Sequence, residues 1–132
     1  VERDQVQANR LTAAREAAHS LGVTVLLKGS TTLVADPSGE VRVNTAATPY
    51  LATAGSGDVL SGVCGALLAG GLSALDAGAA GAFLHGLAGL LARGSPAASI
   101  TASNVVRALP EAARSLGGSL APPAAARKPR PP

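Results

Sequence analysis

Hydrophobic and polar positions in the first half of the chain alternate between helical and strand-like spacing. In residues 2–20 the apolar side chains fall on one side of a helix and most charged side chains on the other, and Gly22 is suited to end that helix. Residues 23–27 are apolar on both faces, which predicts a strand in the interior of a sheet. Residues 32–35 and 40–44 predict two further strands, which an Asp-Pro-Ser-Gly turn joins into a hairpin. A helix followed by strands in this way predicts an α/β fold.

The second half of the chain predicts two long apolar helices. The first opens at Ser56 or Gly57 and ends near Gly70, and its small apolar side chains predict a position deep in the protein. The second begins with a Ser-x-x-Asp capping pattern at 73–76 and continues to about Arg93. Glycines recur along both helices at spacings that favour close packing against other helices and the sheet: Gly62, Gly65, Gly78, Gly81, Gly86 and Gly89.

The C-terminal part predicts short helices and then a tail. Thr101 is expected to cap a short helix, and Pro110 to begin a separate helical turn that ends at Leu116. Residues 117–132 are mostly Gly, Ala, Pro and basic residues with little to bury, so they are expected to be disordered. Residues 1–116 are expected to form one domain.

Composition and charge exclude several classes of function. Of the 132 residues 47% are apolar but only 2% are aromatic, so the core must consist of Ala, Val and Leu. The net charge of +3 arises in the tail, because three of the eleven basic residues occupy its last six positions and the other eight balance eight acidic residues. Without a basic stripe or an aromatic stacking surface, nucleic-acid binding is not expected.

Sites based on cysteine or histidine are not expected either. Cys64 lies alone in an apolar helical segment and is expected to be a small buried hydrophobe, and the two histidines lie far apart, so no metal-ligand set is expected. The apolar segment 59–91 is interrupted around residues 70–76, so no membrane span is expected. No apolar leader opens the sequence, which favours a cytoplasmic location.

The turn before the first apolar helix is the strongest candidate for chemistry. Gly55, Ser56 and Gly57 (the anion turn) would let a phosphate approach the unpaired N–H groups of a helix N-terminus. Asp58 beside it could take a proton from a hydroxyl that attacks phosphorus. The alternative is that Asp58 only caps the helix. The spacing matches neither a P-loop nor a Rossmann fingerprint.

A second candidate follows the strand predicted at 23–27. Lys28, Gly29, Ser30, Thr31 and Thr32 stand where α/β sheets bind ligands, and the ammonium of Lys28 could neutralise phosphate. The alternative is an ordinary solvated lysine in a turn. His85, within the second apolar helix, is interpreted as a hydrogen-bonded packing residue.

Three segments resemble the ADP/ATP-dependent NAD(P)H-hydrate dehydratases of the ribokinase-like superfamily. They are LLKGSTTLVA at 26–35, LATAGSGDVLSG at 51–62 and FLHG at 83–86. The resemblance covers residues 1–116 and implies a three-layer α/β/α fold of which this chain is the C-terminal half. It also implies that Asp58 is the catalytic base and contacts the substrate, that Gly57 contacts the nucleotide, and that residues 28–32 bind the adenine nucleotide.

The activity that the resemblance implies is a lyase reaction in metabolite repair. The S epimer of hydrated NADH or NADPH would be phosphorylated by ADP or ATP and would then lose phosphate, which restores NAD(P)H and releases AMP or ADP. Mg²⁺ is expected to accompany the nucleotide. By the same resemblance the protein could assemble as a tetramer and could be fused to or paired with an epimerase domain.

Two departures from the family pattern keep other functions open. Ala47 and Thr48 stand where the family commonly has Gly-Asn, and the first half of the family domain has no counterpart here. A related ribokinase-like kinase acting on a vitamin precursor or sugar alcohol is one alternative. A truncated, non-catalytic remnant that serves as a scaffold is the other.

Overall fold

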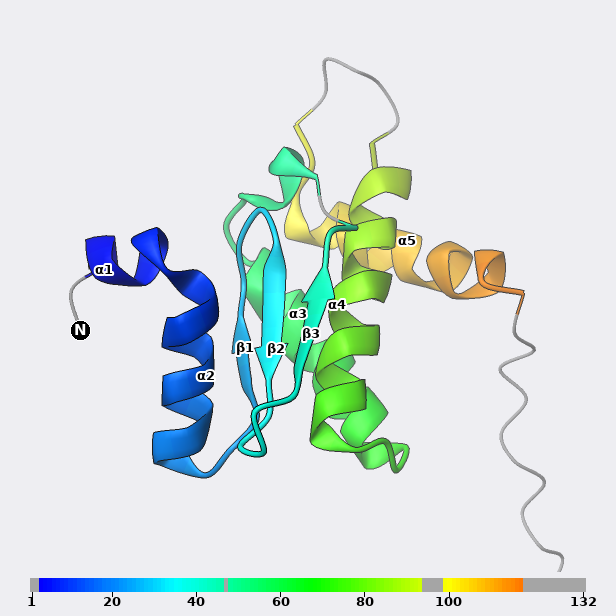
Figure 1. Ribbon diagram of the computed structural model, residues 1–132. Helices are drawn as coiled ribbons and strands as arrows, with labels where there is room; N and C mark the ends of the chain where they lie inside the picture. Colours follow the sequence, from blue (N-terminus) through cyan, green and yellow to red (C-terminus); the bar gives the residue numbers. More distant parts are fainter. Residues whose placement is uncertain (1–2, 47, 94–98, 118–132) are drawn as a thin grey trace, which may run out of the picture.

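The computed structural model describes residues 3–46, 48–93 and 99–117 (Figure 1). The predicted disordered tail lies outside the described residues, apart from Gly117. In chain order the elements are α1 (Arg3–Ala8), α2 (Arg10–Leu21), β1 (Val25–Leu27), β2 (Thr32–Ala35), β3 (Val41–Asn44), the short 3₁₀ helix η1 (Pro49–Leu51), α3 (Ser56–Ala69), α4 (Ala74–Leu91) and α5 (Ala102–Ser115).

The three strands form one antiparallel sheet in the order β1-β2-β3. Every residue of the central strand β2 is buried, and Leu33 pairs with Leu27 on one side and with Val43 on the other. The predicted hairpin between β2 and β3 is confirmed. The prediction of an interior strand at 23–27 is wrong for the described residues: β1 is a three-residue, half-buried edge strand, because the described chain gives it one neighbour.

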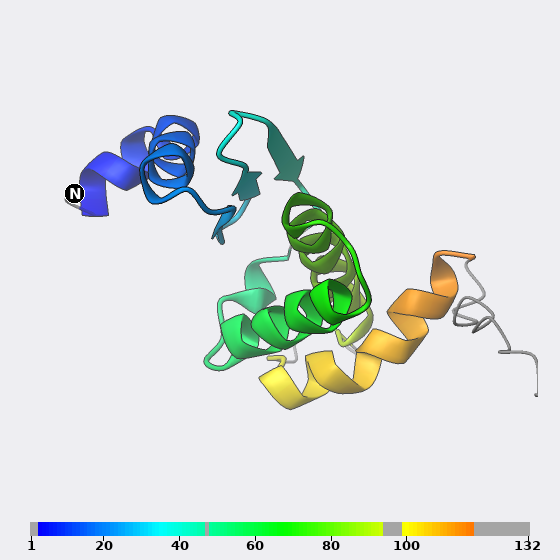
Figure 2. The ribbon, with the colours of Figure 1, turned by 90° about the horizontal axis from the view of Figure 1, so that it is seen from below.

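Helices cover both faces of this sheet. Leu33 and Ala35 pack with Ala14 and Ala18 of α2, whereas Val34, which points the other way, meets α4. Figures 1 and 2 show the sheet between α2 and α4, with α3 and α5 lying beyond it on the α4 side. The predicted three-layer α/β/α arrangement is therefore present.

Glycines let α4 approach its neighbours closely. A Cβ atom on Gly78 would lie 2.7 Å from Val34 Cγ1, and one on Gly81 would lie 2.6 Å from Cys64 Sγ. On Gly86 it would overlap the backbone carbonyl oxygen of Ala46. The predicted close packing is confirmed for these positions of α4.

The deep burial predicted for α3 is wrong. Only Ser56 and Leu60 of this helix are buried, Leu68 is 49% exposed, and a Cβ atom built at Gly62 or Gly65 would have open space around it. One side of α3 packs on α4 and α5, and the described residues provide nothing to cover the other side. Cys64 is correspondingly half-buried rather than buried, and burial raises the pKa of its thiol.

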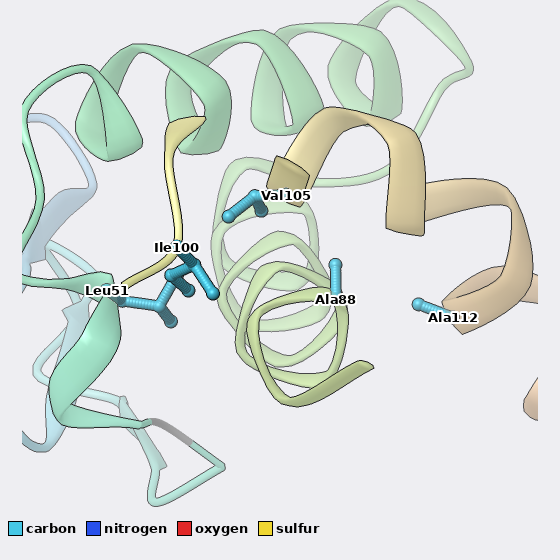
Figure 3. Packing of buried hydrophobic residues seen from close by; sticks show 5 residues of the cluster. All are labelled: Leu51, Ala88, Ile100, Val105 and Ala112. Atoms are coloured by element: carbon cyan, nitrogen blue, oxygen red, sulfur yellow. The ribbon is translucent and has the colours of Figure 1, made fainter. Parts of the chain in front are cut away.

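A hydrophobic cluster joins the loop before α3 to the last two helices. Figure 3 shows its five buried side chains, which come from η1, α4, the segment before α5, and α5: Leu51, Ala88, Ile100, Val105 and Ala112. A Cβ atom on Gly89 would lie 2.8 Å from Leu51, so α4 holds this residue closely. The cluster fixes the backbone of Leu51 just before the predicted anion turn.

Two predicted helix boundaries need correction. The single helix predicted at 2–20 is divided at Asn9, whose side chain accepts a hydrogen bond from the Thr12 N–H and begins α2. The helical turn predicted to begin separately at Pro110 instead continues α5. Proline removes one helical donor, but Val105 before it and Ala112 after it stay buried on the same packed face.

The predicted helix starts at Ser73 and Thr101 are confirmed. Ser73 Oγ accepts a hydrogen bond from the Asp76 N–H at 3.1 Å. Thr101 forms a full capping box with Asn104.

Among the described residues, α4 is the one helix long and apolar enough to cross a membrane. Half of its 18-residue apolar window is buried inside the protein, and core helices of soluble proteins pass the same test. The expected absence of a membrane span remains a prediction.

We expect Gly86→Ala to destabilise the fold by about 1–3 kcal/mol, as overpacking typically does, because its new methyl group overlaps a backbone carbonyl that cannot rotate away. The matched control Gly62→Ala, in open space on α3, should stabilise by up to about 1 kcal/mol through helix propensity. Urea unfolding of both variants measures the difference. Equal free energies of unfolding would contradict the close α4 packing.

Candidate functional site

The N-terminus of α3 exposes a carboxylate beside a glycine turn. Gly55 is the N-cap residue with φ of 81°, and no side chain caps the helix. A Cβ atom at Gly55 would also lie 3.1 Å from Ala102 Cβ, so this position requires glycine. Asp58 is exposed and lies in the first helical turn rather than at the N-cap, and its carboxylate makes no hydrogen bond or ion pair with the described residues. A side-chain capping hydrogen bond therefore does not explain Asp58, and the structural alternative that stays is a favourable charge at the helix N-terminus.

The anion turn and the adjacent Asp58 contain one buried residue, Ser56, and exposed residues on either side of it. Ser56 is 2% exposed, and its Oγ donates a hydrogen bond of 2.6 Å to the Leu51 carbonyl oxygen. Its N–H donates to the Thr53 carbonyl oxygen at 3.3 Å. Gly57 and Asp58 are exposed, and within the described chain their N–H groups have no backbone acceptor. Two N–H groups at the end of a 14-residue helix are thus available to an anion.

The lysine after β1 reaches the same carbonyl group. Lys28 is half-buried, and its Nζ donates a hydrogen bond of 3.2 Å to the Leu51 carbonyl oxygen. This oxygen therefore accepts from both Lys28 and Ser56. The interpretation of Lys28 as an ordinary solvated lysine does not fit, because its ammonium is held by backbone 23 residues further along the chain.

A pocket of about 490 Å³ lies beside this shared acceptor. Four of the five residues predicted to bind the nucleotide line this pocket, and they come from the β1–β2 loop and the start of β2: Lys28, Gly29, Ser30 and Thr32. Thr31 does not line the pocket, and its carbonyl oxygen accepts a hydrogen bond from Arg10, which does not line it either. Gly57 and Asp58 do not line it either; they are connected to it through Ser56 and the Leu51 carbonyl group.

His85 is the main residue of this pocket that the sequence interpretation missed. It is 3% exposed, it lines the pocket, and its Nε2 has no hydrogen-bond partner among the described residues. Burial lowers the pKa of His85; the Ser56 backbone opposes this shift, and the positive charge of Lys28 adds to it. The ring is therefore neutral at pH 7. The interpretation as a hydrogen-bonded packing residue is wrong for Nε2, although the FLHG segment had already marked the position.

Two buried polar residues opposite the loop also line the pocket. Asn44 ends β3, and its Oδ1 accepts a hydrogen bond from the Ala46 N–H at 3.1 Å. Thr48 Oγ1 accepts from the Tyr50 N–H at the start of η1. Nothing in the sequence pattern singles out Asn44, and Thr48 was noted only as a departure from the family pattern.

The described ranges 3–46, 48–93 and 99–117 contain no cluster of three or more His, Cys, Asp or Glu side chains able to hold a metal ion. The pocket instead presents hydroxyl groups, an ammonium group and a neutral imidazole. Such a lining suits a polar ligand that brings negative charge.

Comparison with known proteins identifies relatives of this chain. The family model described as NAD(P)H-hydrate dehydratase matches residues 2–111. The bifunctional NAD(P)H-hydrate repair enzyme Nnr of Mycobacterium tuberculosis is 57% identical over 58 residues, which are 44% of this chain and 12% of that protein. The ADP-dependent (S)-NAD(P)H-hydrate dehydratase of Neisseria meningitidis is 53% identical over 62 residues, which are 47% of this chain and 21% of that protein.

A solved structure has the same fold. The ADP/ATP-dependent NAD(P)H-hydrate dehydratase of Bacillus subtilis, co-crystallised with ATP and Mg²⁺, superposes with a TM-score of 0.78 at 28% identity. The superposition covers 85% of this chain and 41% of that chain, so this chain spans less than half of its solved relative. The predicted ribokinase-like α/β fold is confirmed, and the chain belongs to the NAD(P)H-hydrate dehydratase family.

Proposed function

We propose that this chain carries the nucleotide-binding and phosphate-handling part of an ADP-dependent (S)-NAD(P)H-hydrate dehydratase. The observation that carries the proposal is the meeting of Lys28 and the anion turn at one carbonyl oxygen, that of Leu51. A cation and a helix N-terminus held by the same acceptor form a site suited to phosphate. Membership of the NAD(P)H-hydrate dehydratase family supports hydrated NADH or NADPH as the substrate.

The pocket beside residues 28–32 would hold the adenine nucleotide. Its volume of about 490 Å³ falls within the range of small-molecule sites. Lys28 now donates to a neutral carbonyl oxygen, and a phosphate oxygen would be a stronger, charge-assisted acceptor for it. Gly29, Ser30 and Thr32 would add contacts from the loop and the start of β2, and Gly57 would bring its N–H from the α3 side.

Asp58 would act as the general base on the hydrate. As the substrate hydroxyl attacks the terminal phosphorus of ADP, Asp58 takes the hydroxyl proton, and AMP leaves with the electrons of the broken P–O bond. The C–O bond of the new phosphoester then breaks, and inorganic phosphate departs with that electron pair. Loss of a proton from the adjacent ring carbon re-forms the double bond of NAD(P)H. Exposure of Asp58 beside the turn suits this role.

A Mg²⁺ ion would enter this site as a companion of the nucleotide rather than as an ion held by the protein alone. The described residues form no three-ligand cluster, so the ion would depend on phosphate oxygens and water, with Asp58 as the nearby carboxylate of the α3 turn. When bound, it would offset the charge that develops during phosphoryl transfer.

The remaining part of the family domain would complete the substrate pocket. Three surfaces are open to it: the edge of β1, the uncovered side of α3, and an apolar groove of about 600 Å³ between α2 and β1. The groove includes Val6, Leu21, Val25 and Leu27. The matched region spans 41% of the solved relative, which leaves ample structure to cover these surfaces. Fusion with an epimerase, tetramer formation and a cytoplasmic location remain proposals.

Restoration of NADH tests the function directly. The chain is assayed alone and joined to the first part of the domain from the Neisseria meningitidis relative, with (S)-NADH hydrate and ADP, while dihydronicotinamide absorbance is followed. The proposal predicts ADP-dependent recovery of NADH in the joined protein, with release of phosphate. A stable phosphoester without recovery would instead indicate a ribokinase-like kinase.

We expect Asp58→Asn in the joined protein to reduce turnover by roughly 10²-fold or more, because the amide cannot accept the hydroxyl proton. Calorimetry should find ADP affinity nearly unchanged. Asp76→Asn is the matched control: Asp76 also lies in the first turn of an apolar helix, but Ser73 and Arg42 bind its carboxylate. If Asp58→Asn turns over as fast as the wild type, Asp58 is not the general base and only contributes a favourable charge at the helix N-terminus.

We expect Lys28→Ala to weaken ADP binding by roughly tenfold, the loss of one hydrogen bond from a charged donor. Titration calorimetry of the joined protein measures this affinity. Arg15→Ala, which removes an exposed cation from α2, is the control for the change in net charge. If Lys28→Ala and Arg15→Ala bind ADP equally well, the pocket beside β1 does not hold the phosphates.

A further inference from the structure

A second cation holds the β1–β2 loop from outside the pocket. Arg10, at the first position of α2, donates from Nη2 to the Leu27 carbonyl oxygen at 3.0 Å and to the Thr31 carbonyl oxygen at 3.2 Å. Its Nη1 donates to Gln7 Oε1 at 3.3 Å. Leu27 is the last residue of β1, and Thr31 immediately precedes β2. One guanidinium group therefore joins the two ends of the loop.

Gly29 makes room for this guanidinium group. A Cβ atom at Gly29 would lie 2.5 Å from Arg10 Nη2 and 2.8 Å from Cζ, although the backbone there has no left-handed φ. The glycine thus leaves room for Arg10, and a methyl group there would displace the guanidinium group from its present position. Gly29 also lines the pocket, so it lies between the guanidinium group and the pocket.

We propose that Arg10 is a positioning residue for the phosphate-binding loop. It binds two loop carbonyl oxygens, so neither is presented to an incoming phosphate, and it fixes the separation of the loop ends that carry Lys28 and Thr32. Its half-buried positive charge adds to the potential that attracts phosphate. The inference rests on the proposed nucleotide role of residues 28–32.

The same helix provides an internal comparison. Arg15 is exposed, and its guanidinium group makes no hydrogen bond or ion pair within the described chain. A Cβ atom built at Gly39, in the β2–β3 turn, would lie 3.5 Å from Arg15 Nη2, which is ordinary van der Waals contact. Arg15→Met and Arg10→Met therefore remove the same group from the same helix, and only Arg10→Met releases the loop. Arg10→Lys keeps the charge without the planar group.

Backbone order of the loop tests the inference without any ligand. NMR relaxation of the joined protein should give amide order parameters for residues 29–31 near the rigid value of about 0.85 in the wild type and Arg15→Met, and below about 0.6 in Arg10→Met. Arg10→Lys should be intermediate. An equally rigid loop in a folded Arg10→Met, checked by circular dichroism, would overturn the inference.

Nucleotide affinity then separates this inference from the proposed function. Arg10→Met should raise the KM for ADP by roughly tenfold and leave kcat nearly unchanged, since Arg10 does not line the pocket. Gly29→Ala should weaken ADP binding similarly in the wild type but have little further effect in Arg10→Met, because the two act through one contact. If the losses in ADP-binding free energy from Gly29→Ala and Arg10→Met simply add in the double variant, the inference is overturned. If wild-type protein fails to bind ADP, the proposed function fails, and the order parameters alone decide the role of Arg10.

Discussion

The candidate site depends on one carbonyl oxygen that accepts two hydrogen bonds. Leu51 offers this oxygen to Lys28 from the end of β1 and to Ser56 from the start of α3, so it joins the sheet to the helix N-terminus. Its side chain is fixed independently, in the cluster with Ile100 and Val105 (Figure 3). Because the packing anchors the acceptor, the two donors are positioned before any ligand arrives.

Small residues make this arrangement possible. Without a glycine at position 86, α4 could not pack against the carbonyl group of Ala46, and without one at 89 it could not hold Leu51 so closely. In an almost non-aromatic core, close backbone approach replaces the contact area that large side chains would give. His85 is buried beside the pocket, and there desolvation lowers the pKa of its ring and favours the neutral form.

Features that depend on a few neighbouring residues were predicted correctly more often than the burial of whole helices and strands. The hairpin turn and the caps at Ser73 and Thr101 follow from side-chain chemistry within a few residues, and the structure contains them. The meeting of the two candidate segments at the Leu51 carbonyl group was not predicted, because it joins residues 23 positions apart in the chain. The exposure of α3 and the edge position of β1 could not be predicted, because an apolar segment does not say which part of the fold covers it. The division at Asn9 depends on a single side-chain cap that helical periodicity conceals.

The central claim is that phosphate binds where residues 28–32 and the anion turn meet. NMR titration of the isotope-labelled joined protein with ADP and, separately, with adenosine tests this claim most directly, because the two ligands differ only in the phosphates. The account predicts that ADP shifts the amide signals of Gly29, Ser30, Gly57 and Asp58, and that adenosine leaves those of Gly57 and Asp58 in place. Equal shifts with both ligands, or shifts confined to the α2–β1 groove, would contradict it.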